Sequence, residues 1–172
     1  KDLTNKKFLI TGGCTSEKID AARTITNNSS GTMGLLLAQV ARFRGAEVIY
    51  IHGPLKNKKD ITEGIKRYEI ATSADLSKVI KKEISSCDYL IMNAAIADFK
   101  IKGDTSKKFP KNKLENFLSN NIELIPDILK DLCETKKQTQ VFVGFCAFTG
   151  SIKSAMKNIK EKIILKGCDL LF

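Results

Sequence analysis

A run of amide, hydroxyl and glycine residues stands just before an apolar stretch near the start of the chain. It reads Ile25-Thr26-Asn27-Asn28-Ser29-Ser30-Gly31-Thr32-Met33-Gly34. Asn28, Ser29 or Ser30 could cap the helix that the apolar stretch predicts, so that the first free N–H groups of the helix face whatever the turn encloses. The glycines would let a phosphate or carboxylate approach the backbone closely. The run therefore predicts an anion site, although an ordinary loop and helix cap has the same composition.

A second stretch combines small side chains with one carboxylate, and it reads Asn93-Ala94-Ala95-Ile96-Ala97-Asp98-Phe99. The one histidine of the chain, His52, ends an apolar run and is expected to be structural. Since the sequence shows no obvious pairing of serine or cysteine with a base, chemistry would rely on amides, hydroxyls, lysines and a metal ion. Positioning and charge neutralisation by such groups suit nucleotidyl or phosphoryl transfer better than hydrolysis.

Lysine supplies most of the formal charge of +10, which admits nucleic acid, anionic lipid or anionic metabolites as partners. Positive charge is densest in segment 100–113, which contains Lys100, Lys102, Lys107, Lys108, Lys111 and Lys113. Glycine, proline and small polar residues between these lysines predict a mobile loop that could close on a polyanion. Aromatic residues interleaved with arginine, which favour a single-strand nucleic-acid surface, are scarce there. A basic nucleic-acid-binding module remains an alternative.

Hydrophobic periodicity predicts the elements that must position these residues. Strands are expected at 7–11, 47–52, 67–71, 89–93, 141–145 and 169–172. Helices are expected at about 32–44, from a cap at Ser73 to 84, and at 126–134 and 152–165. The alternation predicts an α/β fold with a doubly wound parallel sheet, Rossmann-like, in three layers and with strand order 3-2-1-4-5-6. Residues 12–13 and 93–99 should then meet at the carboxyl edge of the sheet, where such folds bind ligands.

Length and composition limit the class of protein. The 172 residues suffice for one domain with a substantial core, and the apolar runs are too short to span a bilayer. No signal-peptide pattern opens the chain, so a cytoplasmic location is expected. The five cysteines are odd in number and form no C-x-x-C pair, which argues against a disulfide framework or a zinc site.

An NAD(P)-binding Rossmann protein is the other alternative for such a fold, and the motifs disfavour it. The first turn, Gly12-Gly13-Cys14-Thr15-Ser16-Glu17, lacks the spaced third glycine of G-x-G-x-x-G. The second predicted strand ends in His52-Gly53-Pro54, without an acidic residue for a ribose 2′-OH or an arginine for a 2′-phosphate. A Tyr-x-x-x-Lys pair and a Walker lysine motif are absent as well.

Five motifs follow one another along nearly the whole chain. They are Thr11-Gly12-Gly13-Cys14-Thr15-Ser16-Glu17-Lys18-Ile19-Asp20, Arg23-Thr24-Ile25-Thr26-Asn27-Asn28-Ser29-Ser30-Gly31-Thr32-Met33-Gly34, Asn93-Ala94-Ala95-Ile96-Ala97-Asp98-Phe99, Pro126-Asp127-Ile128-Leu129 and Val143-Gly144-Phe145-Cys146-Ala147-Phe148-Thr149. Together they resemble phosphopantothenoylcysteine synthetase, the enzyme of coenzyme A biosynthesis that is often fused to a flavin decarboxylase. The resemblance implies that the carboxylate of 4′-phosphopantothenate attacks the α-phosphate of a nucleoside triphosphate, usually CTP in bacteria. The amine of cysteine would then displace the nucleotide from the acyl-nucleotidyl intermediate.

The resemblance also implies roles for individual residues. Asn27 would hold the pantothenoyl carbonyl and the acyl intermediate, and Arg23 would support that loop or bind an anionic group. Phosphate groups would be held at the helix start by Ser29, Ser30 and Gly31. The nucleotide would be lined by Gly12, Gly13, Ala95, Asp98 and Phe99, with Asp98 also a metal contact. A lysine of the basic segment, Lys107 or Lys108, would close on the triphosphate.

The implied co-substrate is CTP or ATP with Mg²⁺, and the implied partners are 4′-phosphopantothenate, cysteine, a second copy in a homodimer, and a phosphopantothenoylcysteine decarboxylase, fused or separate. No nucleic acid or membrane partner is expected. Because the chain begins without Met and ends in a predicted strand, 1–172 is expected to be a single nucleotide-binding synthetase domain that lacks its C-terminal arm. Two positions depart from the family, since Thr32 replaces the usual lysine of Ser-Gly-Lys-Met-Gly and Phe148 stands where glutamate is common.

Overall fold

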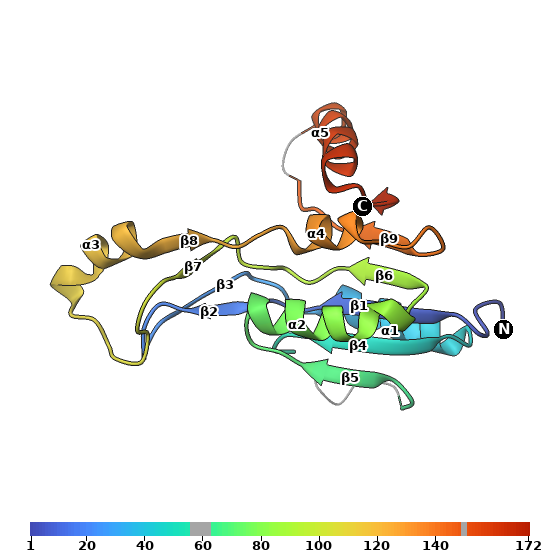
Figure 1. The fold of residues 1–172 in the computed structure, drawn as a ribbon, viewed down its shortest axis with the longest axis horizontal. Coiled ribbons are helices and arrows are strands. Elements are labelled where there is room, and N and C mark those ends of the chain that lie inside the picture. The colour runs from blue at the N-terminus through green and yellow to red at the C-terminus, as the bar shows by residue number, and fades with distance from the viewer. Residues whose placement is uncertain (56–62, 149–150) are drawn as a thin grey trace.

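The structure of the chain, a computed structural model, describes residues 1–55, 63–148 and 151–172. Within these residues six parallel strands form the main sheet, in the order β10-β9-β6-β1-β4-β5 (Figure 1). Their bounds are β1 Lys7–Gly12, β4 Glu47–His52, β5 Lys66–Glu69, β6 Tyr89–Met92, β9 Val141–Gly144 and β10 Leu170–Leu171. Counted along the chain, this order is 3-2-1-4-5-6. The predicted Rossmann-like topology is therefore confirmed.

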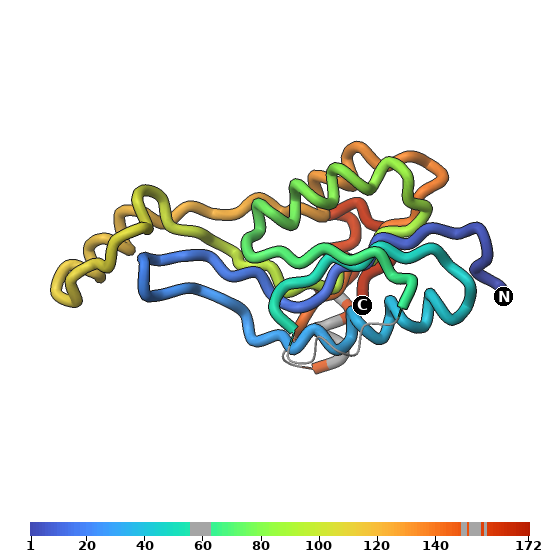
Figure 2. The backbone as a smooth tube through the Cα atoms, turned by 90° about the horizontal axis from the view of Figure 1, so that it is seen from below, coloured from blue at the N-terminus to red at the C-terminus, as the bar shows by residue number. Residues whose placement is uncertain are grey.

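Helices cover both faces of the main sheet (Figure 2). The described helices are α1 Thr32–Phe43, α2 Ser73–Glu83, a 3-10 turn η2 Ile84–Ser86, α3 Lys111–Asn121, α4 Ile128–Glu134 and α5 Ile152–Lys166. Side chains of β1 alternate between two buried clusters: Phe8 and Ile10 pack with α1, and Leu9 packs with α2 and α4. This alternation is expected of a strand buried on both faces. None of the described helices is long and apolar enough to cross a membrane.

Three helix starts differ from the predicted ones. Thr72, not Ser73, caps α2, and it forms a capping box with Asp75. Asp127 caps α4, one residue after the proline that was expected to open it. At α1 the cap position belongs to Gly31, whose φ of 75° is left-handed, and Ser30, one residue earlier, accepts from Thr32 N through its hydroxyl.

An extension outside the main sheet was not predicted. It contains two antiparallel ladders, β2 Ser16–Lys18 with β3 Thr24–Thr26 and β7 Phe99–Ile101 with β8 Ile122–Leu124, and α3 stands between β7 and β8. β2 and β7 contact each other, and both ladders reach away from the sheet (Figures 1 and 2). We call residues 16–26 and 99–124 the arm.

The lysine-rich segment 100–113 belongs to this arm, and the prediction of a continuous loop there is wrong at both ends. Lys100 lies in β7, whereas Lys111 and Lys113 lie in the first turn of α3. The ring of Phe109 stacks on that of Phe117 in α3, with centroids 3.7 Å apart. Phe109 thus packs against the helix that follows it, whereas most of the other residues between β7 and α3 are exposed.

Candidate active site

The floor of the candidate site is a seam between the segments that follow β1 and β6. Ala95 N donates to Gly13 O at 2.8 Å, and Thr15 N donates to Ala95 O at 3.1 Å, so that Cys14 and Ala95 form an isolated parallel bridge. Both backbone groups of Ala95 are therefore engaged. Only its small methyl side chain is left for contact with a ligand.

Two buried threonine hydroxyls tighten this seam. Thr11 Oγ1 accepts from the N–H groups of Asn93 and Ala94, at 3.1 and 3.0 Å. Thr15 Oγ1 accepts from Ala97 N at 2.9 Å. These hydroxyls satisfy N–H groups that the ending strand leaves without a partner. Sequence reasoning did not assign them a role, although Thr11 at the end of an apolar strand was an available signal; Thr15, in the turn after β1, offered none.

Glycine contacts bring the start of α1 directly onto the turn after β1. A Cβ at Gly34 would lie 2.8 Å from both Gly12 Cα and Thr11 O, and one at Gly31 would lie 3.2 Å from Gly13 Cα. The approach at Gly34 leaves no room for a side chain, and at Gly31 the left-handed φ of 75° disfavours one as well. The buried hydroxyl of Tyr50 donates to Gly31 O at 3.3 Å and holds the cap in place.

The polar run before α1 lies on the same surface. Thr26 Oγ1 donates to Thr15 O at 2.9 Å, and the exposed Asn27 donates through Nδ2 to Ile96 O at 2.8 Å. Ser30 Oγ accepts from Thr32 N at 3.3 Å, and the two hydroxyls of this pair lie 2.8 Å apart. The first helical bond of α1 runs from Leu35 N to Gly31 O. Because Thr32 N is already bonded to Ser30 Oγ, the N–H groups of Met33 and Gly34 are the ones at this helix start without a partner inside the helix.

The structure thus brings together most of the residues predicted to bind the substrates. Those gathered at the carboxyl edge of β1 and β6 are Gly12, Gly13, Asn27, Ser29, Ser30, Gly31 and Ala95. Of the two departures from the family, Thr32 is exposed at the first position of α1, and Phe148 is 37% exposed. Thr149, the last residue of the fifth motif, lies outside the described residues.

Asp98 and Phe99 stand at the base of the arm. Asp98 is exposed, its backbone carbonyl accepts from Ile125 N at 2.9 Å, and Phe99 pairs with Leu124 at the start of β7. The described residues contain no group of three histidine, cysteine or acidic side chains that could hold a metal ion by itself. One exposed carboxylate fits Mg²⁺ that arrives on a nucleotide, because this ion keeps several waters and commonly takes its other ligands from phosphates.

Arg23, Lys107 and Lys108 lie in the arm instead. Arg23 and Asn27 are four residues apart along extended chain, which corresponds to about 13 Å. Arg23 Nη2 donates to Phe109 O at 3.1 Å. A hollow of about 600 Å³ beside it is lined by Arg23, Lys108, Phe109, Pro110, Lys111 and Leu114. The extended β3 therefore carries Arg23, and with it the segment of Lys107 and Lys108 that Arg23 contacts through Phe109, away from Asn27 within this chain.

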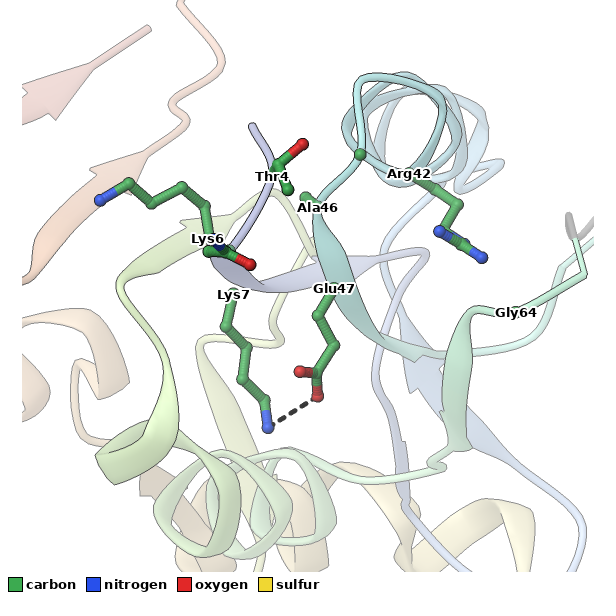
Figure 3. A pocket seen from close by; sticks show the side chains of 9 residues that line it. Thr4, Lys6, Lys7, Arg42, Ala46, Glu47 and Gly64 are labelled. Carbon is green, nitrogen blue, oxygen red and sulfur yellow. Dashed lines mark ion pairs between the residues drawn. The ribbon is translucent and has the colours of Figure 1, made fainter. Parts of the chain in front are cut away.

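Another hollow, of about 550 Å³, opens at the opposite, amino edge of the sheet (Figure 3). Its wall includes the start of β1 and of β4, where Lys7 Nζ lies 2.8 Å from Glu47 Oε1. Arg42 of α1 turns its guanidinium towards Gly64 rather than towards this pair. The hollow is separated from the seam by the length of the strands and belongs to no predicted site.

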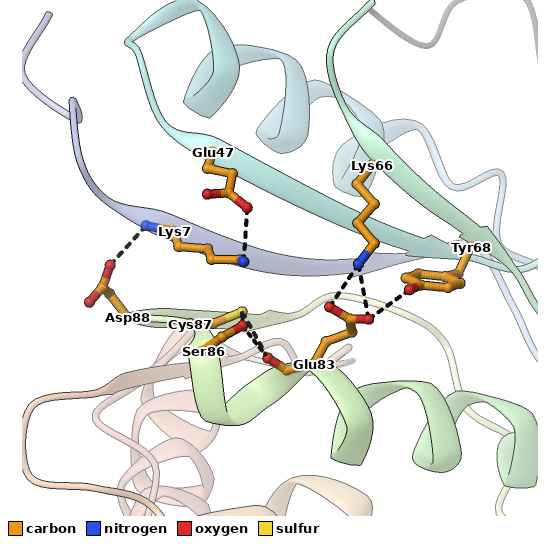
Figure 4. A network of polar contacts seen from close by, with 8 residues as sticks. All are labelled: Lys7, Glu47, Lys66, Tyr68, Glu83, Ser86, Cys87 and Asp88. Atoms are coloured by element: carbon orange, nitrogen blue, oxygen red, sulfur yellow. Dashed lines mark hydrogen bonds and ion pairs between the residues drawn. The ribbon is translucent and has the colours of Figure 1, made fainter.

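A polar network near this edge holds α2 to the strands (Figure 4). Glu83, 7% exposed, accepts from Tyr68 Oη at 2.6 Å and from Lys66 Nζ at 3.1 and 3.0 Å. The Tyr68 hydrogen bond, followed by that of Lys66, lowers the pKa of the Glu83 carboxyl against the effect of burial. His52 is buried as well, with Nδ1 2.8 Å from Gly53 O, which agrees with a structural histidine. These groups serve the fold.

Comparisons with known proteins match a region of the chain that includes both the seam and the arm. The family model of the DNA/pantothenate metabolism flavoprotein C-terminal domain matches residues 3–172. The Coenzyme A biosynthesis bifunctional protein CoaBC of Borreliella burgdorferi is 38% identical over 169 residues, which are 98% of this chain and 42% of that protein. The chain therefore spans about two fifths of the length of that relative.

Solved structures show the same fold. The crystal structure of the C-terminal domain of the Coenzyme A biosynthesis bifunctional protein CoaBC has a TM-score of 0.81 and 31% sequence identity, and the match covers 98% of this chain and 76% of that one. A Cab2 variant in complex with phosphopantothenate-cysteine has a TM-score of 0.77 at 16% identity, with 98% of this chain and 72% of that one covered. The second likeness is one of fold alone.

Proposed function

Because this chain belongs to the family of the DNA/pantothenate metabolism flavoprotein C-terminal domain, we propose that it joins 4′-phosphopantothenate to cysteine in coenzyme A biosynthesis. The observation that carries the proposal is the convergence of Asn27, the Gly31 cap and Ala95 on one seam at the carboxyl edge of β1 and β6. Such an edge is where open α/β sheets bind ligands. The product that we propose is also the ligand of the Cab2 variant with this fold.

The reaction runs in two steps, each of which needs placement of anions more than an acid or a base. In the first, a carboxylate oxygen of 4′-phosphopantothenate forms a bond to the α-phosphorus of a nucleoside triphosphate, and the bond to pyrophosphate breaks. The N–H groups of Met33 and Gly34 at the start of α1, with the hydroxyls of Ser29 and Ser30, are suited to hold phosphate oxygens in line. Mg²⁺ bound with the nucleotide, and in contact with Asp98, would neutralise charge on the leaving pyrophosphate.

In the second step the amine of cysteine attacks the acyl carbon, the bond to the nucleotide oxygen breaks, and the amine loses a proton. Asn27 supplies an uncharged amide at this place, anchored on Ile96 O. A neutral group is suitable because a carboxylate there would repel both the substrate carboxylate and the α-phosphate. The small-residue seam of Ala94–Ala97 would line the base and ribose, and we propose CTP before ATP as the nucleotide on the ground of family resemblance.

The full chain, supplied with 4′-phosphopantothenate, cysteine, Mg²⁺ and each nucleoside triphosphate in turn, tests the proposal. We expect pyrophosphate release that requires phosphopantothenate, with phosphopantothenoylcysteine formed only when cysteine is added. CTP should support the reaction better than ATP. A basic nucleic-acid-binding module would release no pyrophosphate with any nucleotide, and that result would overturn the proposal.

A further inference from the structure

Glu17 is a buried carboxylate in β2 that the proposed reaction does not use. It is only 5% exposed, although β2 lies outside the main sheet. Burying such a group is unfavourable unless hydrogen bonds compensate it. Its Oε1 accepts from Ser73 N at 2.7 Å, across 56 residues of sequence. Glu17 therefore binds the first residue of α2 from outside the helix.

The start of α2 provides a donor that needs this partner. Ser73 N has no acceptor inside the helix, because the first helical bond runs from Leu76 N to Thr72 O. The hydroxyl of Thr72 accepts from Asp75 N at 3.1 Å, so the helix's own cap satisfies a different N–H group. A carboxylate at this end also interacts favourably with the helix dipole.

The backbone of the preceding residue adds a second link. Ser16 N donates to Ala71 O at 2.8 Å, in the segment that joins β5 to α2. These elements are firmly held, since β5 pairs with β4 in the main sheet and Leu76 and Ile80 of α2 are fully buried. Two consecutive residues of β2 are thus anchored on the main sheet and its helix.

The anchored strand β2 in turn carries the backbone that leads to Asn27. In the β2–β3 ladder Glu17 pairs with Ile25. Thr26 Oγ1 donates to Thr15 O at 2.9 Å, and Asn27 follows Thr26 directly. Asn27 therefore lies two residues beyond the partner of Glu17, on a strand that β2 holds against the seam.

We propose that Glu17 is a positioning residue, which fixes the β2–β3 hairpin on the start of α2 and so holds the amide of Asn27 at the seam. This inference rests on the proposed function, in which Asn27 supplies that amide to the reacting acyl group. A displacement of about 1 Å in such a group can lower a rate about 10²-fold. Because its side chain is buried against Ser73, Glu17 itself does not touch the substrate.

The first experiment compares hydrogen exchange in the wild-type chain and in Glu17→Met, without ligand. Methionine has a similar length but offers no oxygen to Ser73 N, so a peptide covering residues 24–28 should exchange about tenfold faster. Thr72→Val is the matched control, because the Thr72 hydroxyl caps the same helix within its own turn. It should loosen the start of α2 and leave residues 24–28 unchanged. Equal exchange of this peptide in Glu17→Met and the wild type would overturn the positioning role, as would equal acceleration in Glu17→Met and Thr72→Val.

The second experiment separates positioning from loss of folded enzyme by steady-state kinetics. Glu17→Met should lower kcat for phosphopantothenoylcysteine formation about tenfold, whereas Glu17→Gln, which keeps an acceptor oxygen, should stay within about twofold of the wild type. Thr72→Val should keep the wild-type kcat. In an Asn27→Ala background Glu17→Met should add less than about twofold, since the amide that it positions is gone. A full tenfold loss in that background would indicate general damage and would overturn the proposal.

Two further outcomes are distinguishable. If the wild-type chain forms no product, the proposed function fails, and the exchange measurement still decides whether Glu17 fixes the hairpin. If circular dichroism shows that Glu17→Met does not fold, Glu17→Asp replaces it in both experiments. Aspartate keeps the charge but is one methylene shorter, so its carboxylate falls short of Ser73 N and the same faster exchange and lower kcat are expected.

Discussion

Asn27 joins two segments that lie far apart in the sequence, since its Nδ2 reaches Ile96 O across 69 residues. We expect Asn27→Ala to fold and to bind nucleotide nearly as well as the wild type, yet to form the amide about 10²–10³-fold more slowly. That loss is typical of removing one oriented donor at developing charge. Phosphopantothenoylcysteine formed per enzyme is the measurement, and Asn27→Asp should be as slow or slower.

Asn28→Ala is the neighbouring control, because Asn28 is exposed in the same run and has no assigned role. Asn27→Gly tests whether the residue only shapes the turn. Among the described non-glycine residues a positive φ occurs at Asn5, not at Asn27, so glycine gains nothing from left-handed freedom there. Turnover of Asn27→Gly near the wild-type level would remove Asn27 from the catalytic residues.

Helix α2 is the element whose attachment depends most clearly on pH. The pKa of Glu83 is lowered, first by Tyr68 and then by Lys66, so its stabilising contribution is present above its usual pKa of 4.5 and is lost as the pH falls through the lower, folded value. We expect Glu83→Gln to reduce the free energy of unfolding by about 1–2 kcal/mol at pH 7. Below pH 4 the difference from the wild type should shrink, as measured by urea unfolding.

Glu47→Gln is the matched control for this prediction. Glu47 pairs with Lys7 but its side chain is 67% exposed, and an exposed ion pair contributes about 0–1 kcal/mol. A difference between Glu83→Gln and the wild type that grows on acidification would contradict the assignment of the network to Glu83.

Most elements of the main sheet could be predicted because they combine an apolar run with a turn signal, whereas the polar edge strand β5, Lys66–Glu69, begins and ends before the predicted 67–71. β4, for example, has the predicted bounds, since Ala46 and Gly53 flank a run whose side chains from Val48 onward are all buried. The arm could not be predicted, because β2, β3, β7 and β8 have three residues each and no readable period. Its order comes from contacts between distant residues, such as Asp20 with Phe109.

The candidate site, like the fold, could be predicted in part. The polar run before α1 identified Asn27 and the phosphate-binding residues, because their types are suited to anions. It did not identify how the neighbouring segment after β6 is held, since Thr11 and Thr15 accept through their hydroxyls from backbone N–H groups of that segment. The family resemblance also implied that Arg23 supports the loop of Asn27 or binds an anionic group, whereas the extended β3 carries it into the arm.

At the scale of the whole molecule the path of the chain distinguishes two kinds of nucleotide binder. In a dinucleotide-binding fold the first strand passes through a short glycine turn directly into its helix. Here the β2–β3 hairpin intervenes between β1 and α1, and the bridge of Cys14 with Ala95 closes the turn. We expect calorimetry to detect binding of CTP and none of NAD(H) or NADP(H). Tight binding of a nicotinamide dinucleotide without binding of CTP would replace the ligase by an oxidoreductase.

The hydrogen bond from Ile125 N to Asp98 O joins the two ends of the excursion that carries β7, α3 and β8. The chain therefore leaves the main domain after β6 and returns to it before α4 at the same place. The positions of the strands in the main sheet do not depend on the length of the excursion. Insertions and deletions are tolerated where the ends of a segment already meet. The excursion can accordingly differ in length while β6 and α4 keep their places on either side of it, although its contacts with β2 and Asp20 tie it to the β2–β3 hairpin.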